Sequence, residues 1–235
     1  MVKVLKQCFQ ETPCVAMAFA SPLCMRLTDP VTQTERVNVM PQLDFAKEFK
    51  GAIKGIEETG NKINVQIVPA TLEKFTNCLM QKPIGLHFTG HGVENNADTL
   101  GQDTYLMSNQ GNCLVFEKED ASAHFVSQQK LKGLFEMHVA SLKFVFIATC
   151  HSEFAGEIFH SAGVDHVICV KQGCTIIDDA AIFFARKFYQ TLFMEKYTIC
   201  DSFKMAQNCL KMHPEYTIQQ EAEKLIMILN TDEIE

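Results

Sequence analysis

Two short runs of the sequence contain residue types that could form a nucleophilic site. One is Gly90-His91-Gly92, and the other is Ala148 to Ser152, which contains Cys150 and a second histidine. A thiol of ordinary pKa is only a few per cent thiolate near neutral pH, so a nucleophilic cysteine needs a neighbouring base or a positive environment. We therefore predict that Cys150 is a nucleophile and that His91 is its base.

The glycine after His91 indicates a second role for the same run. Gly92 has no side chain, so its backbone N–H can approach a reacting carbonyl and, with the N–H of Cys150, form an oxyanion hole. Removing one such donor typically raises a reaction barrier by about 3 kcal/mol. We also expect a helix that begins just after Cys150 to direct its N-terminal amides at the sulfur and to favour the thiolate.

The hydrophobic pattern places both runs at the ends of strands. An apolar run over 84–88 leads into Gly90-His91-Gly92, and a run over 144–149 without polar alternation ends at Cys150. Such continuous apolar strands are typical of parallel sheets covered by helices on both faces. Ligands of open parallel sheets bind outside the carboxyl ends of the strands, so His91 and Cys150 should meet at that edge.

Apolar runs alternate with helical periodicity along most of the chain, which predicts βαβ units in an α/β fold with a mainly parallel sheet. Further strands are predicted at 14–20, 63–68 and 164–170. Residues 24–41 have a loop-like composition, and a surface hairpin is predicted from the runs 105–107 and 113–116. Helices are predicted at 45–56, 71–80, 124–137, for about ten residues after Cys150, at 178–192, 201–212 and 217–229.

Composition excludes several classes of protein. The 235 residues are 47% hydrophobic, which suits a single globular domain over 1–235. A net charge of -7 argues against nucleic-acid binding, and no basic tract or long apolar run indicates a membrane partner. The 10 cysteines are irregularly spaced, as expected of free thiols in a reducing, cytoplasmic location. No zinc-finger spacing or phosphate-binding glycine motif occurs, so we predict no metal and no cofactor.

Other interpretations of these residues exist. A cysteine at the end of a buried strand is, by itself, more often a small apolar core residue, and a Gly-His-Gly run can be a simple turn. A metal site could use His87, His91, Cys150 and His151, but His87 and His91 span a strand and its following turn, so their side chains need not converge. His151 could replace His91 as the base, although a sequence neighbour usually projects away from Cys150.

The order and surroundings of the motifs add a resemblance to a known family. His91 precedes Cys150 by 59 residues, close to the roughly 50 residues typical of caspases. The chain resembles the CHAT family, caspase-like peptidases related to caspases, metacaspases and separase. The resemblance covers about 14–210 and is carried by Ala20-Ser21-Pro22-Leu23, His87 to Gly92, Phe146 to Ser152, Ala162 to Ile168 and the helix from Asp179 to Tyr189.

This resemblance implies a caspase-like three-layer α/β/α sandwich and cysteine endopeptidase activity on protein or peptide substrates. It assigns the dyad to His91 and Cys150 and the oxyanion hole to the amides of Gly92 and Cys150. CHAT domains often lie beside repeat or ATPase modules in longer chains, so such a regulatory module is an expected partner. A catalytically silent scaffold or sensor of the same fold is the alternative.

The substrate pocket departs from the related families. In caspases and metacaspases the residue two before the cysteine helps to form the pocket for the side chain preceding the cleaved bond, and metacaspases have Asp there. Here that residue is Ala148, and the loop 171–174 with Gln172 and Gly173 contains no acid. We therefore expect a neutral or apolar preference. The sixth strand of the fold is not evident, because the pattern after 192 is helical.

Overall fold

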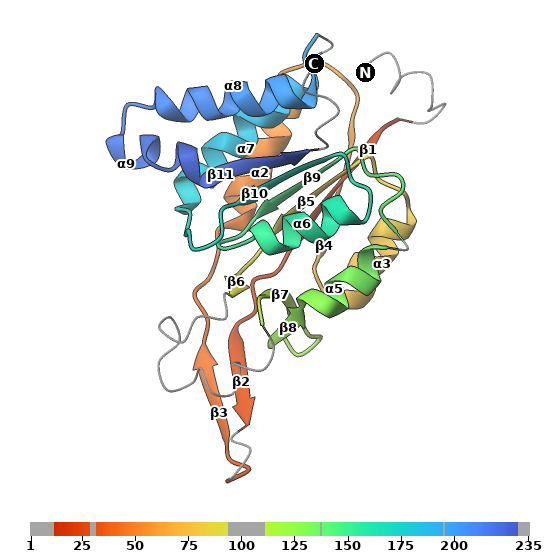
Figure 1. Ribbon diagram of the computed structural model, residues 1–235, viewed down its shortest axis with the longest axis vertical. Coiled ribbons are helices and arrows are strands. Elements are labelled where there is room, and N and C mark those ends of the chain that lie inside the picture. Colours follow the sequence, from red (N-terminus) through yellow and green to blue (C-terminus); the bar gives the residue numbers. More distant parts are fainter. Residues whose placement is uncertain (1–11, 29–31, 94–110, 137, 195, 230–235) are drawn as a thin grey trace.

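A six-stranded sheet forms the centre of the molecule (Figure 1). The computed structural model describes residues 12–28, 32–93, 111–136, 138–194 and 196–229. The sheet has the strand order β11-β10-β9-β5-β1-β4. Its strands are β1 (Cys14–Phe19), β4 (Asn64–Pro69), β5 (Gly85–Thr89), β9 (Phe144–Ala148), β10 (His166–Val170) and β11 (Leu225–Leu229).

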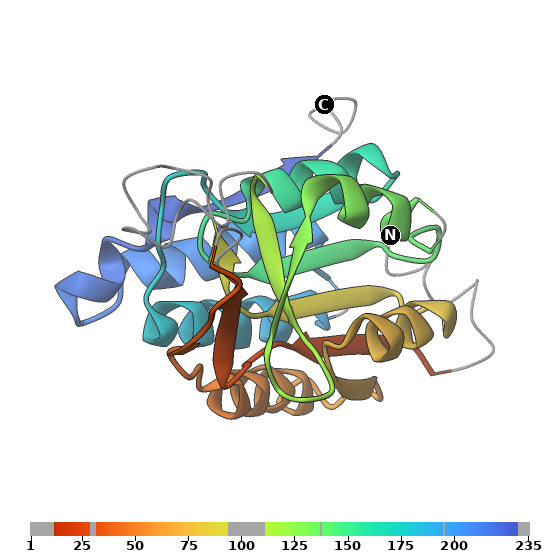
Figure 2. The ribbon, with the colours of Figure 1, turned by 90° about the horizontal axis from the view of Figure 1, so that it is seen from below.

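The first five of these strands pair in parallel, and only β11 runs antiparallel to its neighbour β10. Helices cover both faces. One face carries α2 (Phe45–Glu57), α7 (Asp178–Leu192) and α8 (Ile199–Lys211), and the other carries α3 (Leu72–Met80), α5 (Gln128–Phe135) and α6 (Glu153–Ser161). Figure 2 shows α2 and the pair α5 and α6 on opposite sides of the sheet. The predicted three-layer α/β/α architecture is confirmed.

Strand β9 explains why the sequence shows no polar alternation before Cys150. Val145 and Ile147 pack into the core beneath α5 and α6, whereas Phe144 and Phe146 pack into the core beneath α2 and α7. All four side chains are buried, because each face of the strand meets a helical layer. The strand is therefore fixed on both sides, and the position of Cys150 at its end is fixed with it.

Two segments predicted from the sequence are wrong. Residues 24–41 were expected to be a loop, but β2 (Cys24–Thr28) and β3 (Glu35–Val39) pair as an antiparallel hairpin. Most residues of β3 are exposed, so the strand has no apolar face for the sequence pattern to reveal. The helix expected at 124–137 is also shorter, because β8 (Ala123–Ser127) precedes α5.

The predicted hairpin of 105–107 and 113–116 is only partly within the described residues. Residues 105–107 lie outside them. The second half is β7 (Cys113–Glu117), which pairs with β8 on one side and with the short β6 (Gly92–Val93) on the other. This small sheet therefore attaches to the residue directly after His91.

The end of the chain is the largest correction. A helix was predicted at 217–229, but the structure has a short helix α9 (Tyr216–Gln219), a 3₁₀ turn (Ala222–Lys224) and then β11. The sixth strand that the sequence did not reveal is therefore present. A short apolar run such as Leu225–Leu229 fits either a strand or one face of a helix, and pairing with β10 decides between them.

The strand order creates a crevice between β1 and β5. The chain leaves β1 through α2 towards β4, whereas it leaves β5 towards β9 on the opposite side. Such a reversal, at the carboxyl ends of the strands, is where open α/β sheets bind ligands.

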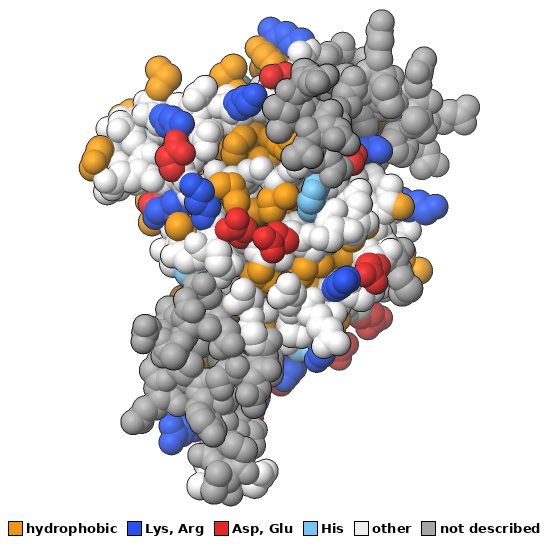
Figure 3. All heavy atoms as spheres, in the orientation of Figure 1, with side chains coloured by type: hydrophobic (Ala, Val, Ile, Leu, Met, Phe, Trp, Pro, Cys, Tyr) orange, Lys and Arg blue, Asp and Glu red, His pale blue; other side chains and the backbone are white. Residues whose placement is uncertain are grey.

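On the face seen in Figure 3, Lys and Arg side chains are scattered in small groups beside Asp and Glu, without one continuous basic patch. Within the described ranges no helix is long and apolar enough to cross a membrane.

Candidate active site

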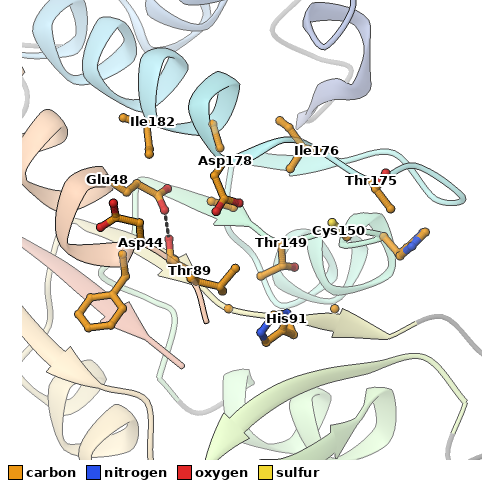
Figure 4. Close-up of a pocket in the computed structure, with 17 residues that line it drawn as sticks. Asp44, Glu48, Thr89, His91, Thr149, Cys150, Thr175, Ile176, Asp178 and Ile182 are labelled. Atoms are coloured by element: carbon orange, nitrogen blue, oxygen red, sulfur yellow. Dashed lines mark hydrogen bonds between the residues drawn. The ribbon is translucent and has the colours of Figure 1, made fainter. Parts of the chain in front are cut away.

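A cavity of about 250 Å³ opens at the carboxyl ends of β5 and β9. It is lined by the connection into α2, the carboxyl ends of β5 and β9, and the loop into α7 (Figure 4). His91, Gly92, Ala148 and Cys150 all line it. The structure therefore brings together the residues that the sequence placed at two separate strand ends.

A backbone carbonyl in the connection between β3 and α2 orients the imidazole of His91. Its Nε2 atom lies 2.9 Å from the carbonyl oxygen of Pro41. A carbonyl oxygen can only accept a hydrogen bond, so Nε2 must carry the hydrogen. In the neutral imidazole Nδ1 is then the basic nitrogen, and the orientation of the ring is set by the backbone.

Gly92 lies directly against the backbone of Cys150. A Cβ atom at position 92 would overlap the Cys150 carbonyl oxygen and would also crowd the Thr149 hydroxyl. The Val115 N–H donates to the His91 carbonyl (2.9 Å), which makes Gly92 and Leu114 a non-hydrogen-bonded pair of β6 and β7. The N–H of such a residue points away from the partner strand. The Gly92 amide therefore projects from the edge of the small sheet, as an oxyanion donor requires.

The thiol of Cys150 is half-buried, and this burial disfavours its thiolate form. Burial raises its pKa above the ordinary value, and a hydrogen bond from the Ile176 backbone only partly opposes that shift. The helix expected to lower the pKa begins at Glu153, and the Ser152 hydroxyl bonds Ile147 and Val170 instead of capping it. The favourable effect expected from the helix end stays a prediction, and burial opposes it.

The residue after Cys150 makes a sharp turn. His151 has φ 54°, in the left-handed region that non-glycine residues rarely adopt, and its N–H donates to the Cys174 carbonyl at 3.0 Å. Strained backbone of this kind is concentrated at functional sites. His151 lines the same cavity as Cys150, contrary to the expectation that it projects away.

His87 is separate from this group. Its side chain is fully buried beneath α2, where Nε2 lies 2.9 Å from Glu48 Oε1, and the other Glu48 oxygen accepts from Thr89 at 2.8 Å. His87 does not line the cavity that His91, Cys150 and His151 share. Within the residues that the structure describes, no group of three or more His, Cys, Asp or Glu side chains could hold a metal ion.

The far wall of the cavity differs from the prediction. Ala148 lines it, but Gln172 and Gly173 do not, and the loop after β10 contributes Thr175 and Ile176 instead. The Gln172 N–H donates a hydrogen bond to the Glu153 carboxylate at 2.7 Å. This bond holds the beginning of the loop against α6.

Sequence reasoning missed three carboxylates in the lining, from Asp44, Glu48 and Asp178. They lie at the beginnings of α2 and α7. Acids at helix N-termini are common because they cap amides and complement the helix dipole, so their sequence position gave no sign of a pocket.

The chain has structural likenesses but no match in sequence. No protein-family model matches it, and no curated protein does. Among solved structures it is similar to caspase-1 from Spodoptera frugiperda, with a TM-score of 0.48, 11% identity and coverage of 93% of this chain and 86% of that one. It is also similar to the C-terminal domain of the coenzyme A biosynthesis bifunctional protein CoaBC, with a TM-score of 0.34, 13% identity and coverage of 68% and 75%. Likenesses of this size say nothing about catalytic residues, so any function must be argued from the site itself.

Proposed function

We propose that this protein is a cysteine endopeptidase of the caspase-like kind, with Cys150 as nucleophile and His91 as base. The observation that carries the proposal is the hydrogen bond from His91 Nε2 to the Pro41 carbonyl, at 2.9 Å. It leaves Nδ1 as the basic nitrogen in a cavity that the Cys150 thiol also lines. The order of motifs that resembles the CHAT family supports the same function.

The first half of the reaction forms an acyl-enzyme. His91 Nδ1 removes the thiol proton as the Cys150 sulfur attacks the peptide carbonyl carbon. The negative charge that develops on the carbonyl oxygen accepts hydrogen bonds from the amides of Gly92 and Cys150. The C–N bond then breaks, and the imidazolium returns its proton to the departing amine. A thioester on Cys150 remains.

The second half restores the enzyme. A water molecule attacks the thioester carbonyl and loses a proton to His91, and the same two amides hold the oxyanion again. The C–S bond breaks, the carboxylic acid product leaves, and the proton on His91 returns to the sulfur. Burial raises the pKa of Cys150 and disfavours the resting thiolate, so we expect proton transfer to accompany attack.

A second candidate is a scaffold or sensor with the same fold and no catalysis. The raised pKa of Cys150 favours this candidate, because burial disfavours the thiolate in the resting protein. The two candidates differ in one measurable property, which is the hydrolysis of peptide bonds.

The deciding experiment exposes a proteome-derived peptide library to the wild type, Cys150→Ala and His91→Gln, and identifies new N-termini by mass spectrometry. Cys209→Ala is a matched control, because Cys209 is also a partly buried free thiol but lies on α8. His151→Gln tests the competing base. We expect cleavage by the wild type, Cys209→Ala and His151→Gln, and none by the two dyad variants.

Three results would contradict the proposal in whole or in part. Equal cleavage by the wild type and Cys150→Ala would remove Cys150 from the reaction. Absence of cleavage by the wild type across the library would favour the scaffold. Loss of cleavage in His151→Gln with retention in His91→Gln would transfer the role of base to His151.

A further inference from the structure

The cavity beside Cys150 is strongly acidic. Its lining includes Asp44, Glu48 and Asp178 but no Lys or Arg. Figure 4 shows these carboxylates gathered at one side of the cavity, with His91 and Cys150 at the other. A pocket with several negative charges and no cation lowers the free energy of a bound positive group and raises that of a bound negative one.

Asp178 is the carboxylate with the fewest partners. Among the described residues no hydrogen bond or ion pair to its carboxylate occurs, whereas the adjacent Asp179 pairs with Lys47 at 2.6 Å outside the cavity. Burial, Glu48 and Asp179 raise the pKa of Asp178, and the nearby His91 lowers it. Asp178 also affects the Cys150 thiol electrostatically, so it lies within reach of both dyad residues.

Glu48 holds negative charge deeper in the same pocket. Glu48 as a whole residue is only 5% exposed, and its two carboxylate oxygens bond His87 and Thr89. These bonds fix the carboxylate in place beside a cavity whose lining contains no Lys or Arg. Glu48 therefore sets the potential of the pocket, whereas Asp178 is available for direct contact.

An independent feature also indicates a missing polar ligand. Thr149 is 99% buried (1% exposed) and lines the cavity, yet its hydroxyl oxygen has no hydrogen-bond partner among the described residues. Buried hydroxyls are almost always hydrogen-bonded, so this unpartnered hydroxyl, on a residue that lines the cavity, suits a donor group of a bound ligand. A hydroxyl can accept a hydrogen bond from an N–H donor of a bound ligand.

We propose that this cavity receives the side chain of a Lys or Arg residue in the substrate, at the position directly preceding the bond that Cys150 cleaves. The assignment rests on the endopeptidase function proposed above. The cationic head pairs with Asp178 in the field of Glu48 and Asp44. The aliphatic stem lies against apolar lining such as Phe45, Ala148 and Ile182.

Other occupants fit less well. A cavity of 250 Å³ is below the roughly 300–1,000 Å³ of sites for drug-sized ligands and suits one side chain. A metal ion is disfavoured, because no three carboxylates, thiols or imidazoles in the described part of the chain are arranged to hold one. A neutral or apolar side chain would displace water from the carboxylates without pairing their charge.

The inference replaces the neutral or apolar preference expected from sequence. The neutral preference was based on Ala148 and the loop 171–174, and neither contains an acidic residue. The carboxylates come from elsewhere, because the beginnings of α2 and α7 converge on the pocket from 44–48 and 178.

The first test measures binding without catalysis. Cys150→Ala protein is titrated by calorimetry with two acetylated pentapeptide amides that differ only in a last residue of Arg or citrulline, which have nearly the same shape but differ in charge. We expect the Arg peptide to bind at least about tenfold more tightly, as a charge-assisted hydrogen bond provides. The difference should shrink at high salt. Equal affinities would overturn the inference whether or not the protein is a peptidase.

The second test uses neighbouring carboxylates. Asp178→Asn, made in the Cys150→Ala background, should remove most of the preference for Arg over citrulline, and Glu48→Gln should reduce it. Asp179→Asn should retain the preference, because Asp179 pairs with Lys47 and does not line the cavity. An identical loss in the Asp178 and Asp179 variants would mean that the general acidity of α7, and not the pocket, is responsible, and would overturn the assignment.

Cleavage by the wild type separates this inference from the proposed function. Cuts that depend on Cys150 and follow Lys or Arg support both. Cuts that depend on Cys150 but follow neutral or acidic residues would leave the peptidase function intact and overturn the pocket assignment. If no peptide is cut, the peptidase function fails, and the calorimetric comparison still decides whether the pocket selects a cationic side chain.

Discussion

Gly92 lies so close to Cys150 that a Cβ atom at position 92 would overlap the Cys150 carbonyl oxygen. The two residues come from different strand ends, β6 after β5 and the turn after β9. This backbone contact brings together the two residues whose amides are proposed to bind the oxyanion. It also makes the site sensitive to a single methyl group.

We therefore predict that Gly92→Ala lowers kcat by at least about a hundredfold, because the added methyl displaces one oxyanion donor. Gly133→Ala is the matched control, since nothing lies within 4 Å of a Cβ atom at that position in α5. The control should keep full activity and gain up to about 1 kcal/mol of stability, as Ala is favoured over Gly in helices. Thermal unfolding of both variants separates lost activity from lost folding. Normal kcat in Gly92→Ala would contradict the oxyanion assignment.

The raised pKa of Cys150 predicts a slow thiol. Only the thiolate is alkylated, and burial raises the folded-state pKa, so the thiolate fraction near neutral pH is smaller than in an unfolded chain. The rate of iodoacetamide labelling at Cys150, followed by peptide mapping, should therefore reach its plateau at higher pH in the folded protein than in urea. His91→Gln should leave this profile unchanged. A plateau at lower pH in the folded protein, lost in His91→Gln, would instead show a preformed thiolate–imidazolium pair.

The buried pair of Glu48 and His87 predicts a large effect on stability. Their side chains are 7% and 0% exposed and lie 2.9 Å apart. Glu48→Ala should lower the free energy of unfolding by about 3 kcal/mol or more, because it leaves buried polar groups without partners. Glu48→Gln should cost less, since the amide retains hydrogen-bonding atoms.

Glu57→Ala is the control for that series, because Glu57 is an exposed acid at the other end of α2. Its substitution should change stability by no more than about 0.5 kcal/mol in urea unfolding. Similar losses in Glu48→Ala and Glu57→Ala would mean that the pair with His87 contributes little.

The sixth strand is testable by proline substitution. The bond from Lys171 N to Lys224 O, at 2.9 Å, sets a register in which the Ile226 N–H faces Cys169 and the Met227 N–H faces away from β10. Ile226→Pro should lower the free energy of unfolding by about 1–3 kcal/mol more than Met227→Pro, because it leaves a buried carbonyl unpaired. Equal effects, measured by urea unfolding, would contradict this pairing.

Some of the fold follows from local sequence. Strands with apolar residues on both faces, such as β5 and β9, and amphipathic helices such as α2 and α7 show their periodicity directly. Exposed or short elements do not, which is why the hairpin of β2 and β3 and the terminal strand β11 were missed. Their pairing depends on partners distant in the chain, and local periodicity does not record such partners.

The same division applies to the site. The sequence by itself determined the reactive residue types and their strand ends, because Gly90-His91-Gly92 and Cys150 each follow a buried strand directly. Only the tertiary structure decided the carbonyl that orients His91, the burial that raises the pKa of Cys150, and the acidity of the pocket. Each of these depends on groups from other elements that folding brings within a few ångströms, and hydrogen bonds, desolvation and charge interactions act only at such distances.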